Sequence, residues 1–535
     1  MMTMSDDYES DLFEAYATIT PQLGGNSSLV ATVGYSWQEQ VWQNNSITLR
    51  DFPNDAIDWS NNYGIAGAFQ LGGASRIGGG SWLSPEDRII AFFGRVNYTW
   101  DNAIFLNASV RHEGSTRLGE ENKWGTFPAV GLGVDLNNYL ELPNVNLLKL
   151  RVGYGVTGAL PGGNGYSREI YGYTGNSSET GWATTFDGGR APNPDLKWEE
   201  KAEINFGLEF ATDRLSATVD VYSRNNTDFI IPFTIEASEH PSGTKFSNAG
   251  KIQTNGVELA ANYDFIQNDK LNYNSGIVLS SYKSTLKEYL NPIELRGSLG
   301  APGQNDTEVV LVQEGEQIGQ IVGSVWSGEV DADGSQIFED VDGDGTIETD
   351  QTKENFTDGD LAVLGNGIPD FELGWTNQLT VGNWNVNAFF RGQFGHSLVN
   401  NYRVFFEPRV GSQTGYNFVN TELADENIKT AKFSSHYVEK ADFFRLDNLS
   451  VSYSFNLGEN LSKYLKSLTA NVAGQNLFTI TSYTGNDPEA SLQDVGNADN
   501  GSDPGTNADP LTPGIDRRNN YFTQRTFSLG LVAKF

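Results

Sequence analysis

The sequence contains no cysteine among its 535 residues. Disulfide bonds, thiolate catalysis and cysteine-ligated metal clusters are therefore excluded. Basic residues are also scarce, because 35 lysines and arginines stand against 68 acidic residues, for a formal net charge of -33 at pH 7. A surface with this charge is poorly suited to the phosphates of nucleic acid, so no nucleic-acid partner is expected.

Long apolar runs are missing too. The chain has no stretch of about 18 apolar residues, the length that a transmembrane helix requires. Residues 1–7 lack the basic region and the apolar stretch of a signal peptide, so we expect any export signal to lie outside this sequence. Glycine is abundant, with 59 residues, and aromatic residues make up 12% of the chain. This combination is typical of β-structure with many turns and bands of aromatic side chains.

The C-terminal segment alternates apolar and polar residues, which indicates a β-strand with one apolar face. Phe527, Leu529 and Phe535 fall on the apolar face. The same period of two recurs along the chain in segments close to the 9–11 residues that cross a bilayer when tilted. The predicted strands are 10–20, 28–38, 90–100, 103–113, 126–136, 147–157, 200–211, 214–226, 252–266, 270–283, 369–381, 384–395, 443–457, 466–478 and 522–535.

The lengths of the connections between successive predicted strands alternate along the chain. Short connections such as 101–102, 267–269 and 382–383 alternate with long ones. Transmembrane β-barrels have short periplasmic turns and long extracellular loops, whereas a soluble sandwich has no reason to sort its loops in this way. The predicted fold is therefore an all-β, antiparallel transmembrane barrel. Its predicted extracellular loops are 39–89, 158–199, 227–251, 284–368, 396–442 and 479–521.

The alternation of short and long connections also predicts which side of the membrane each end of the chain faces. The C-terminus is expected in the periplasm of a bacterial outer membrane, and the first strand is expected to run inward from outside. Residues 1–9 would then belong to an extracellular loop. Single-chain bacterial barrels normally have an even number of strands, so fifteen strands predict the C-terminal portion of a larger barrel. The unpaired edge of the last strand would make such a fragment unstable or prone to aggregate.

Several segments together resemble one protein family, the SusC/RagA-type TonB-dependent transporters of Bacteroidetes. The matching segments extend over nearly the whole chain. They are 93–98 (FGRVNY), 106–115 (LNASVRHEGS), 124–128 (WGTFP), 148–158 (LKLRVGYGVTG), 193–199 (NPDLKWE), 315–330 (GEQIGQIVGSVWSGEV), 340–347 (DVDGDGTI), 441–453 (ADFFRLDNLSVSY) and 474–488 (GQNLFTITSYTGNDP).

The resemblance implies a barrel of 22 strands with an N-terminal plug, of which this chain would hold strands 8 to 22 without the plug. It implies active import of an oligosaccharide or a peptide across the outer membrane. The expected partners are a SusD-like surface lipoprotein, outer-membrane lipid, and the TonB–ExbB–ExbD complex, which would act through the missing N-terminal region. A passive porin or a surface-binding barrel is the alternative, and a soluble secreted β-rich binding protein is a third possibility.

An acidic segment, 340–347, has the spacing of an EF-hand calcium loop at its first positions. Carboxylates stand at positions 1, 3 and 5, and a glycine stands at position 6. Gln351 occupies position 12, where a bidentate acid belongs, and Asp350 precedes it by one residue. A solvated acidic turn would have the same composition, so a structural Ca²⁺ in 340–350 is a hypothesis. Its candidate ligands are Asp340, Asp342, Asp344, Thr346 and Asp350.

Aromatic residues in the predicted loops could stack on sugars or contact a partner lipoprotein, and packing within their own loops is the alternative explanation. These residues are Trp182, Trp326, Tyr402, Phe405, Phe406 and Tyr416. Charged residues on the polar strand faces are expected to face the lumen, as part of a hydrated wall or of a solute path. The ones singled out are Arg95, Arg111, Arg151, Glu209 and Arg391.

No pattern in the sequence indicates an enzyme. The four histidines, at 112, 240, 396 and 436, have no metal-ligand spacing. GxSxG and phosphate-loop motifs are absent. We therefore expect no catalytic residues, and no cofactor other than the hypothetical Ca²⁺.

Overall fold

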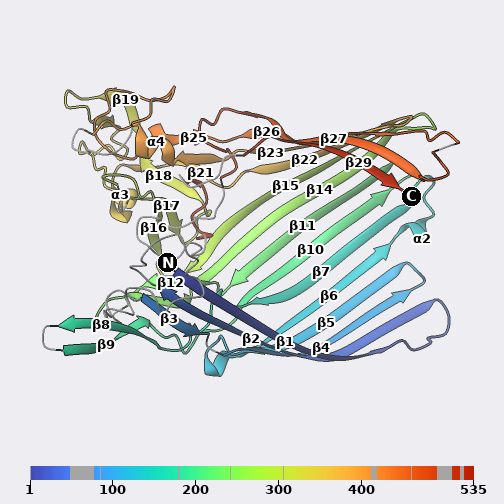
Figure 1. The fold of residues 1–535 in the computed structure, drawn as a ribbon, viewed down its shortest axis with the longest axis horizontal. Coiled ribbons are helices and arrows are strands. Elements are labelled where there is room, and N and C mark those ends of the chain that lie inside the picture. The colour runs from blue at the N-terminus through green and yellow to red at the C-terminus, as the bar shows by residue number, and fades with distance from the viewer. Residues whose placement is uncertain are drawn as a thin grey trace, which may run out of the picture. The chain divides into compact units, whose positions relative to one another are not determined.

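The computed structural model of this chain is dominated by long antiparallel strands, and it also contains several small sheets (Figure 1). Helices are few and short. No helix in the described residues is long and apolar enough to cross a membrane. The structure describes residues 2–48, 78–84, 86–178, 181–240, 242–304, 307–410, 418–459, 461–490, 509–517 and 523–535.

The large sheet confirms the predicted all-β fold class and every one of the fifteen predicted strands. Each strand forms because its residues alternate between an apolar and a polar face. A sixteenth, short strand, β3 (Gly78–Leu83), pairs with β2. The hydrogen-bonded order is β1 (Met2–Ile19), β2 (Ser27–Thr48), β4 (Asp87–Trp100), β5 (Ile104–Ser115), β6 (Trp124–Asp135), β7 (Leu147–Ala159), β10 (Glu199–Ala211), β11 (Leu215–Thr227), β14 (Gly250–Gln267), β15 (Leu271–Tyr289), β22 (Phe371–Val381), β23 (Trp384–Phe394), β26 (Phe443–Ser454), β27 (Ser467–Thr481) and β29 (Thr526–Lys534).

One expectation about the first strand is wrong. Residues 2–9 do not belong to a loop, because Met2–Glu9 pair with Val41–Thr48 in a continuous antiparallel ladder. β2 likewise extends ten residues into the predicted 39–89 loop. These strand ends carry polar residues on both faces, so the alternation on which the prediction rested stops before the backbone pairing does.

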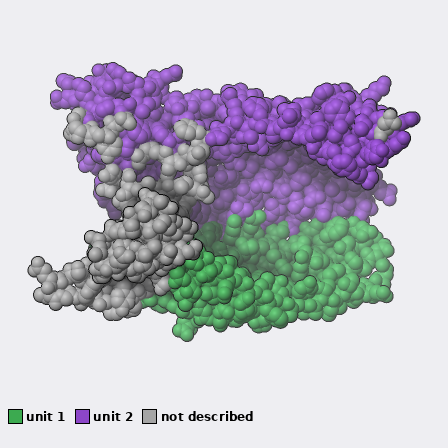
Figure 2. Space-filling model, viewed as in Figure 1, with its two compact units in different colours: residues 1–133, 153–203, 226–249 green, residues 134–152, 204–225, 250–535 purple. Residues whose placement is uncertain are grey.

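Contacts divide the chain into two compact units, coloured separately in Figure 2. Unit 1 comprises residues 1–133, 153–203 and 226–249. A row of aromatic rings crosses its strands. Ring centroids are 5.3 Å apart between Tyr35 and Phe92, 6.5 Å between Phe92 and Trp124, and 4.8 Å between Trp124 and His112. Phe92 is 53% exposed, as expected for an aromatic band at a membrane interface rather than for a soluble core.

A small apolar cluster fills the loop end of unit 1. Ile230 and Phe246, from the hairpin of β12 (Ile230–Thr234) with β13 (Thr244–Asn248), pack against it. A second hairpin of this unit pairs β8 (Ile170–Ser178) with β9 (Gly181–Arg190). The indole N–H of Trp198 donates to the carbonyl of Lys123 at 2.9 Å, which satisfies a polar group inside the cluster. The buried members are Leu118, Phe127, Tyr166, Leu196 and Trp198.

Unit 2 comprises residues 134–152, 204–225 and 250–535. Its strands also carry aromatic pairs. Trp375 stacks on Phe390 with centroids 5.0 Å apart, and Trp384 contacts Tyr453 at 4.8 Å. The Gly382 turn between β22 and β23 has a φ of 55°, a conformation that favours glycine. This spacing of aromatic residues along β23 matches a strand that crosses a bilayer.

The loops of unit 2 are folded. Residues 284–368 contain a four-stranded sheet of β16 (Ile293–Ser298), β17 (Glu308–Gln313), β18 (Gln320–Ser324) and β21 (Leu361–Asn366). They also contain the hairpin β19 (Trp326–Val330) with β20 (Gln336–Phe338) and the helix α3 (Lys353–Asp358). Three further strands form a second small sheet: β24 (Ser397–Asn400), β25 (Val438–Lys440) and β28 (Ile515–Asp516).

An apolar core, here called the loop core, joins these small sheets to the helix α4 (Asn401–Phe406) and the 3-10 turn η5 (Ser435–Tyr437). It draws residues from three predicted loops that are far apart in the sequence. Their packing converts the loops into one folded body. The buried members are Leu299, Ala301, Val309, Val310, Ile321, Val399, Val404, Phe433, Tyr437 and Ile515.

Replacing Ile321 by alanine tests whether this core holds the loops together. Ile321 is fully buried, and truncation of a buried isoleucine costs roughly 2–5 kcal/mol. We expect Ile321→Ala to make the loops of unit 2 at least tenfold more susceptible to proteolysis. Val363→Ala is the matched control, because Val363 lies on the neighbouring strand of the same sheet and is 51% exposed. Equal susceptibility of the two variants to protease would show that burial of Ile321 does not hold the loops together.

Candidate functional site

The loop face of unit 2 is organised around one buried cation, Arg403 in α4. Its side chain is 2% exposed and forms ion pairs with Glu407 at 2.8 Å and Glu439 at 3.0 Å. Its guanidinium also donates to the carbonyl and to the ring Nε2 of His436, at 2.7 and 3.0 Å. Asn400 caps α4 by accepting from the Arg403 N–H, which orients the helix toward these partners.

The same network reaches the last predicted loop. Glu439 accepts hydrogen bonds from the backbone N–H and the hydroxyl of Thr484, at 2.8 and 2.9 Å. The Tyr483 hydroxyl donates to Asp516 at 2.7 Å, and burial raises the pKa of Tyr483 well above its usual range. Loops 396–442 and 479–521 are therefore joined by polar contacts as well as by the loop core.

The imidazole ring of His436, which contacts Arg403, is neutral in this environment. Burial, together with the positive charge of Arg403, lowers its pKa from 6.5 to about 4. Its ring packs edge-on against Trp326, with centroids 4.5 Å apart. Because Nε2 accepts from Arg403, protonation of the ring would place two cations in contact.

The acidic segment forms a tight turn in which carboxylates accept backbone N–H groups. Asp340 accepts from Gly343 at 2.7 Å and from Gly345 at 2.9 Å, while Asp344 accepts from the N–H of Thr346 at 2.7 Å. Gly343 and Gly345 have φ values of 79° and 86°, so the turn needs glycine at both positions. The predicted first half of the calcium loop is thus a well-defined turn.

The structure brings a distant acid to this turn in place of Asp350. Carboxylate oxygens of Asp340, Asp342 and Asp360 lie within 4.8 Å of one another. Asp360 is fully buried and accepts the N–H of Val341 at 2.6 Å and of Glu348 at 2.8 Å. Asp350 instead forms an ion pair with Lys432 at 3.3 Å.

The charges around this turn show an excess of negative potential. Backbone N–H groups, chiefly that of Glu348, hold the pKa of Asp360 below its usual range. Partial burial and the nearby Asp344, Asp342 and Asp360 raise the pKa of Glu348. Carboxylates that repel one another around a shared point form an oxygen donor set suited to a hard divalent cation.

The predicted loop aromatics have different environments. Trp326 donates its indole N–H to the carbonyl of Glu329 at 2.8 Å. Phe405 packs against the loop core and lies 4.5 Å from Phe406, which in turn stacks with Tyr402 at 6.3 Å. Tyr402, Phe405 and Phe406 thus contact one another within their own loop, whereas Trp326 also packs against His436 of another loop. Trp182 lies in β9 with its side chain outside the description, and Tyr416 lies outside the described residues.

The charged residues on the polar strand faces are largely paired. Arg151 forms ion pairs with Glu209 at 2.5 Å and with Asp220 at 3.1 Å, across β7, β10 and β11. Arg111 pairs with Glu113 and donates to Ser36 at 3.4 Å. Such pairing favours a structural wall over a chain of free charges.

Arg95 and Arg391 complete the predicted set. Arg95 is exposed and donates to the Asn97 side chain at 3.3 Å. Arg391 pairs with Asp447 at 3.1 Å and with Glu489 at 2.5 Å. Glu489 belongs to the last predicted loop, so Arg391 joins that loop to β23 and β26.

Sequence reasoning missed three residues that organise this face: Asp360, Arg403 and Arg445. Arg445 is 3% exposed in its side chain and pairs with Asp487 at 2.6 Å. Asp360 and Arg403 lie in segments without an alternating pattern, and an isolated charge in a long loop is normally solvated. Arg403 is followed by two apolar residues, Val404 and Phe405. These apolar neighbours are the signal in the sequence that this segment is buried.

This fold is that of an outer-membrane receptor barrel. Residues 3–477 match the family model described as TonB dependent receptor-like, beta-barrel, and the chain belongs to that family. The family is one of receptors rather than enzymes, as expected, and its members are outer-membrane proteins. The predicted resemblance to the SusC/RagA type is confirmed, because SusC is among the relatives of this chain and a RagAB structure shares its fold.

TonB-dependent receptor P3 of Formosa agariphila is 28% identical over 98% of this chain and 52% of its own length. TonB-dependent receptor SusC of Bacteroides thetaiotaomicron is 25% identical over 84% of this chain and 44% of its own. The chain thus spans about half the length of these relatives. A solved structure of the RagAB peptide transporter shares the fold, with a TM-score of 0.80 at 21% identity over all of this chain and 56% of that one.

The depressed pKa of His436 predicts acid sensitivity of the loop face. The unfolded chain takes up a proton near pH 6.5, whereas the folded state does so only near pH 4. Stability is therefore full above pH 6.5 and falls as the pH drops toward 4, by up to roughly 3 kcal/mol at about 1.4 kcal/mol per pKa unit.

His436→Gln keeps an acceptor for Arg403 but cannot be protonated. Limited proteolysis of loop 396–442 at pH 7.5 and at pH 5 should show a loss of protection in the wild type, and a loss several-fold smaller in this variant. The same acid sensitivity in both proteins would show that another group is responsible.

Proposed function

We propose that this chain forms much of the barrel and the extracellular face of a TonB-dependent importer, which takes up an oligosaccharide or a peptide across the outer membrane. The observation that carries the proposal is the match of residues 3–477 to the receptor barrel family. In this proposal, substrate is captured at the loop face of unit 2 and released inward when TonB acts on a region outside this chain.

The folded state of the loops supports capture rather than simple diffusion. Three long loops are held in one defined surface by the loop core, by the contacts of Arg403 and by the ion pairs of Arg391. A passive pore needs no such surface, whereas a receptor needs a stable one to bind substrate. The paired charges of Arg151 and Arg111 likewise favour a structural wall over a conducting path.

A SusD-like lipoprotein is the proposed partner at this face. RagAB, whose structures share this fold, is named a peptide transporter and a peptide importer. The loop face of this chain exposes apolar side chains, among them Phe418, Val419 and Leu423, at 44–47% exposure. Exposed apolar groups bordered by charge are typical of a protein interface. An orientation with the C-terminus in the periplasm belongs to the same proposal.

Dependence on TonB separates import from the passive-porin and surface-binding alternatives. Cells that express the protein should take up its oligosaccharide or peptide substrate, and deletion of tonB should reduce uptake at least tenfold. Surface binding of labelled substrate should remain. Uptake that persists without TonB would indicate a pore, and binding with no uptake in either strain would indicate a surface receptor.

We further propose that Ca²⁺ stabilises the acidic turn, with Asp340, Asp342 and Asp360 as ligands and with Asp344 and the Thr346 carbonyl nearby. The support is the mutual approach of three carboxylates within 4.8 Å and the raised pKa of Glu348. Bound Ca²⁺ would offset the repulsion among these groups and fix the segment between β20 and β21.

Calcium titration tests this site. Millimolar Ca²⁺ should protect loop 284–368 of the wild type against protease, and Asp342→Asn should weaken this protection at least tenfold in apparent affinity. Asp333→Asn is the matched control, because Asp333 is an exposed aspartate in a neighbouring turn outside the cluster. Equal protection of all three proteins would rule out the site.

A further inference from the structure

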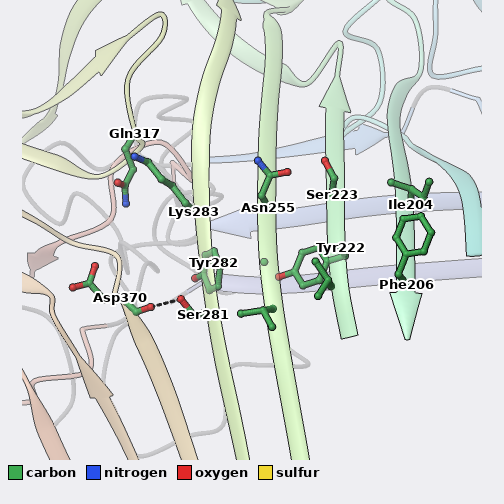
Figure 3. Close-up of a pocket in the computed structure, with 13 residues that line it drawn as sticks. Ile204, Phe206, Tyr222, Ser223, Asn255, Ser281, Tyr282, Lys283, Gln317 and Asp370 are labelled. Carbon is green, nitrogen blue, oxygen red and sulfur yellow. Dashed lines mark hydrogen bonds between the residues drawn. The ribbon is translucent and has the colours of Figure 1, made fainter. Parts of the chain in front are cut away.

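A pocket of about 620 Å³ opens on the strand wall of unit 2 (Figure 3). None of its lining residues belongs to the loop core. The pocket is bordered by strands β10, β11, β14 and β15, and by Gln317 of a loop. Neither the Arg403 network nor the acidic turn contributes to it. Its position on the wall makes it separate from the proposed substrate face.

Strand register shows which face of the wall carries this pocket. Val257 pairs with Ser281, and Asn255 pairs with Lys283. Residues directly opposite in an antiparallel pair share a face, so these four side chains project together. The same pocket is lined by Phe206 and Val221, which are 56% and 51% exposed. Phe206, Val221 and Val257 are exposed apolar residues of the face that meets lipid in a membrane barrel, and they make up the apolar part of the pocket.

The opposite face is occupied by paired polar groups and tyrosines. Asp220, next to Val221, accepts from Arg151. Tyr222 lies against Gly256, where an added Cβ would come within 2.5 Å of its ring. The lack of a side chain at Gly256 therefore accommodates Tyr222 on the polar face, and both residues also border the pocket.

The pocket has an apolar part and a cationic end. Lys283 is exposed and lies on its border, and it forms no ion pair with the side chains in the described part of the chain. Asp370 also borders the pocket, but its backbone carbonyl accepts from the Ser281 hydroxyl at 2.7 Å and its carboxylate points away from Ser281 (Figure 3). The cation is thus available to an anionic group.

The height of Lys283 on the wall matches the level of lipid headgroups. On β15, Ile277 pairs with Trp375 and Ser280 pairs with Glu372, one residue from the stacked pair of Phe371 and Phe394. Lys283 lies three residues beyond Ser280 toward the loops, which is about 10 Å at 3.3 Å per residue. Aromatic side chains mark the interface of a bilayer, and lysines beyond them reach the headgroups.

We propose that this pocket binds a phosphorylated lipid of the outer leaflet, with an acyl chain against Phe206, Val221 and Val257 and a phosphate on Lys283. The proposal rests on the outer-membrane location in the proposed function. Burial of acyl CH₂ groups provides affinity, and a basic residue at headgroup level provides selectivity for anionic lipid. Such a lipid would hold the wall at a fixed depth beside the folded loops.

Native mass spectrometry of the detergent-purified protein from its own outer membrane tests this site. Phosphorylated lipid A and its dephosphorylated form are added as probes, with inorganic phosphate as a competitor. We expect the wild type to prefer the phosphorylated lipid at least fivefold. Lys283→Gln should abolish the preference, and Val257→Trp should reduce binding of both lipids by filling the pocket. Lys287→Gln is the matched control, an exposed lysine on the same strand outside the pocket.

Equal lipid retention in the wild type, Lys283→Gln and Val257→Trp would overturn the lipid site, and so would full competition by inorganic phosphate. TonB-dependent uptake is measured on the same variants. Normal uptake without a lipid preference would refute the lipid site alone. A protein that stays in buffer without detergent would refute the membrane location, and with it both proposals.

Discussion

The folded loop face depends on the burial of one positive charge. Arg403 is nearly inaccessible, and a buried guanidinium is tolerated only when anions and acceptors surround it. Glu407, Glu439 and His436 supply that environment. These partners come from both sides of loop 396–442, and Glu439 in turn binds Thr484 of the next loop. Satisfying Arg403 therefore fixes the path of two loops that would otherwise be free.

The strands and the loops are stabilised in different ways. Strand pairs such as β14 with β15 need only backbone hydrogen bonds and an apolar face, because their exposed side chains meet lipid. The loops face water and need a core of their own, which Ile321, Val399 and Tyr437 provide. Long loops with such a core keep a defined surface, whereas loops of similar length without one would sample many conformations.

The strands could be predicted from the sequence because alternation is local. Fifteen strands of the large sheet follow from a period of two, read over about ten residues. The short strand β3 and the polar extensions of β1 and β2 lack that period and were not predicted. The site could be predicted only in part. Asp340, Asp342 and Asp344 lie in one short turn, so their proximity is a local property. Asp360 joins them from 20 residues away, and nothing in the chain between them specifies that contact.

Ion pairs between residues far apart in the sequence also escape prediction from local patterns. Alternation places Arg151 and Arg391 on the polar faces of their strands, but it cannot name their partners. Glu489 reaches Arg391 across nearly a hundred residues, because the fold returns that loop over the end of β23. Each such pair costs desolvation and gains little by itself near water, so its value lies in selecting one loop arrangement among many. The charges on this face thus act chiefly as determinants of loop geometry, and the surface they define is the part of the molecule on which recognition would depend.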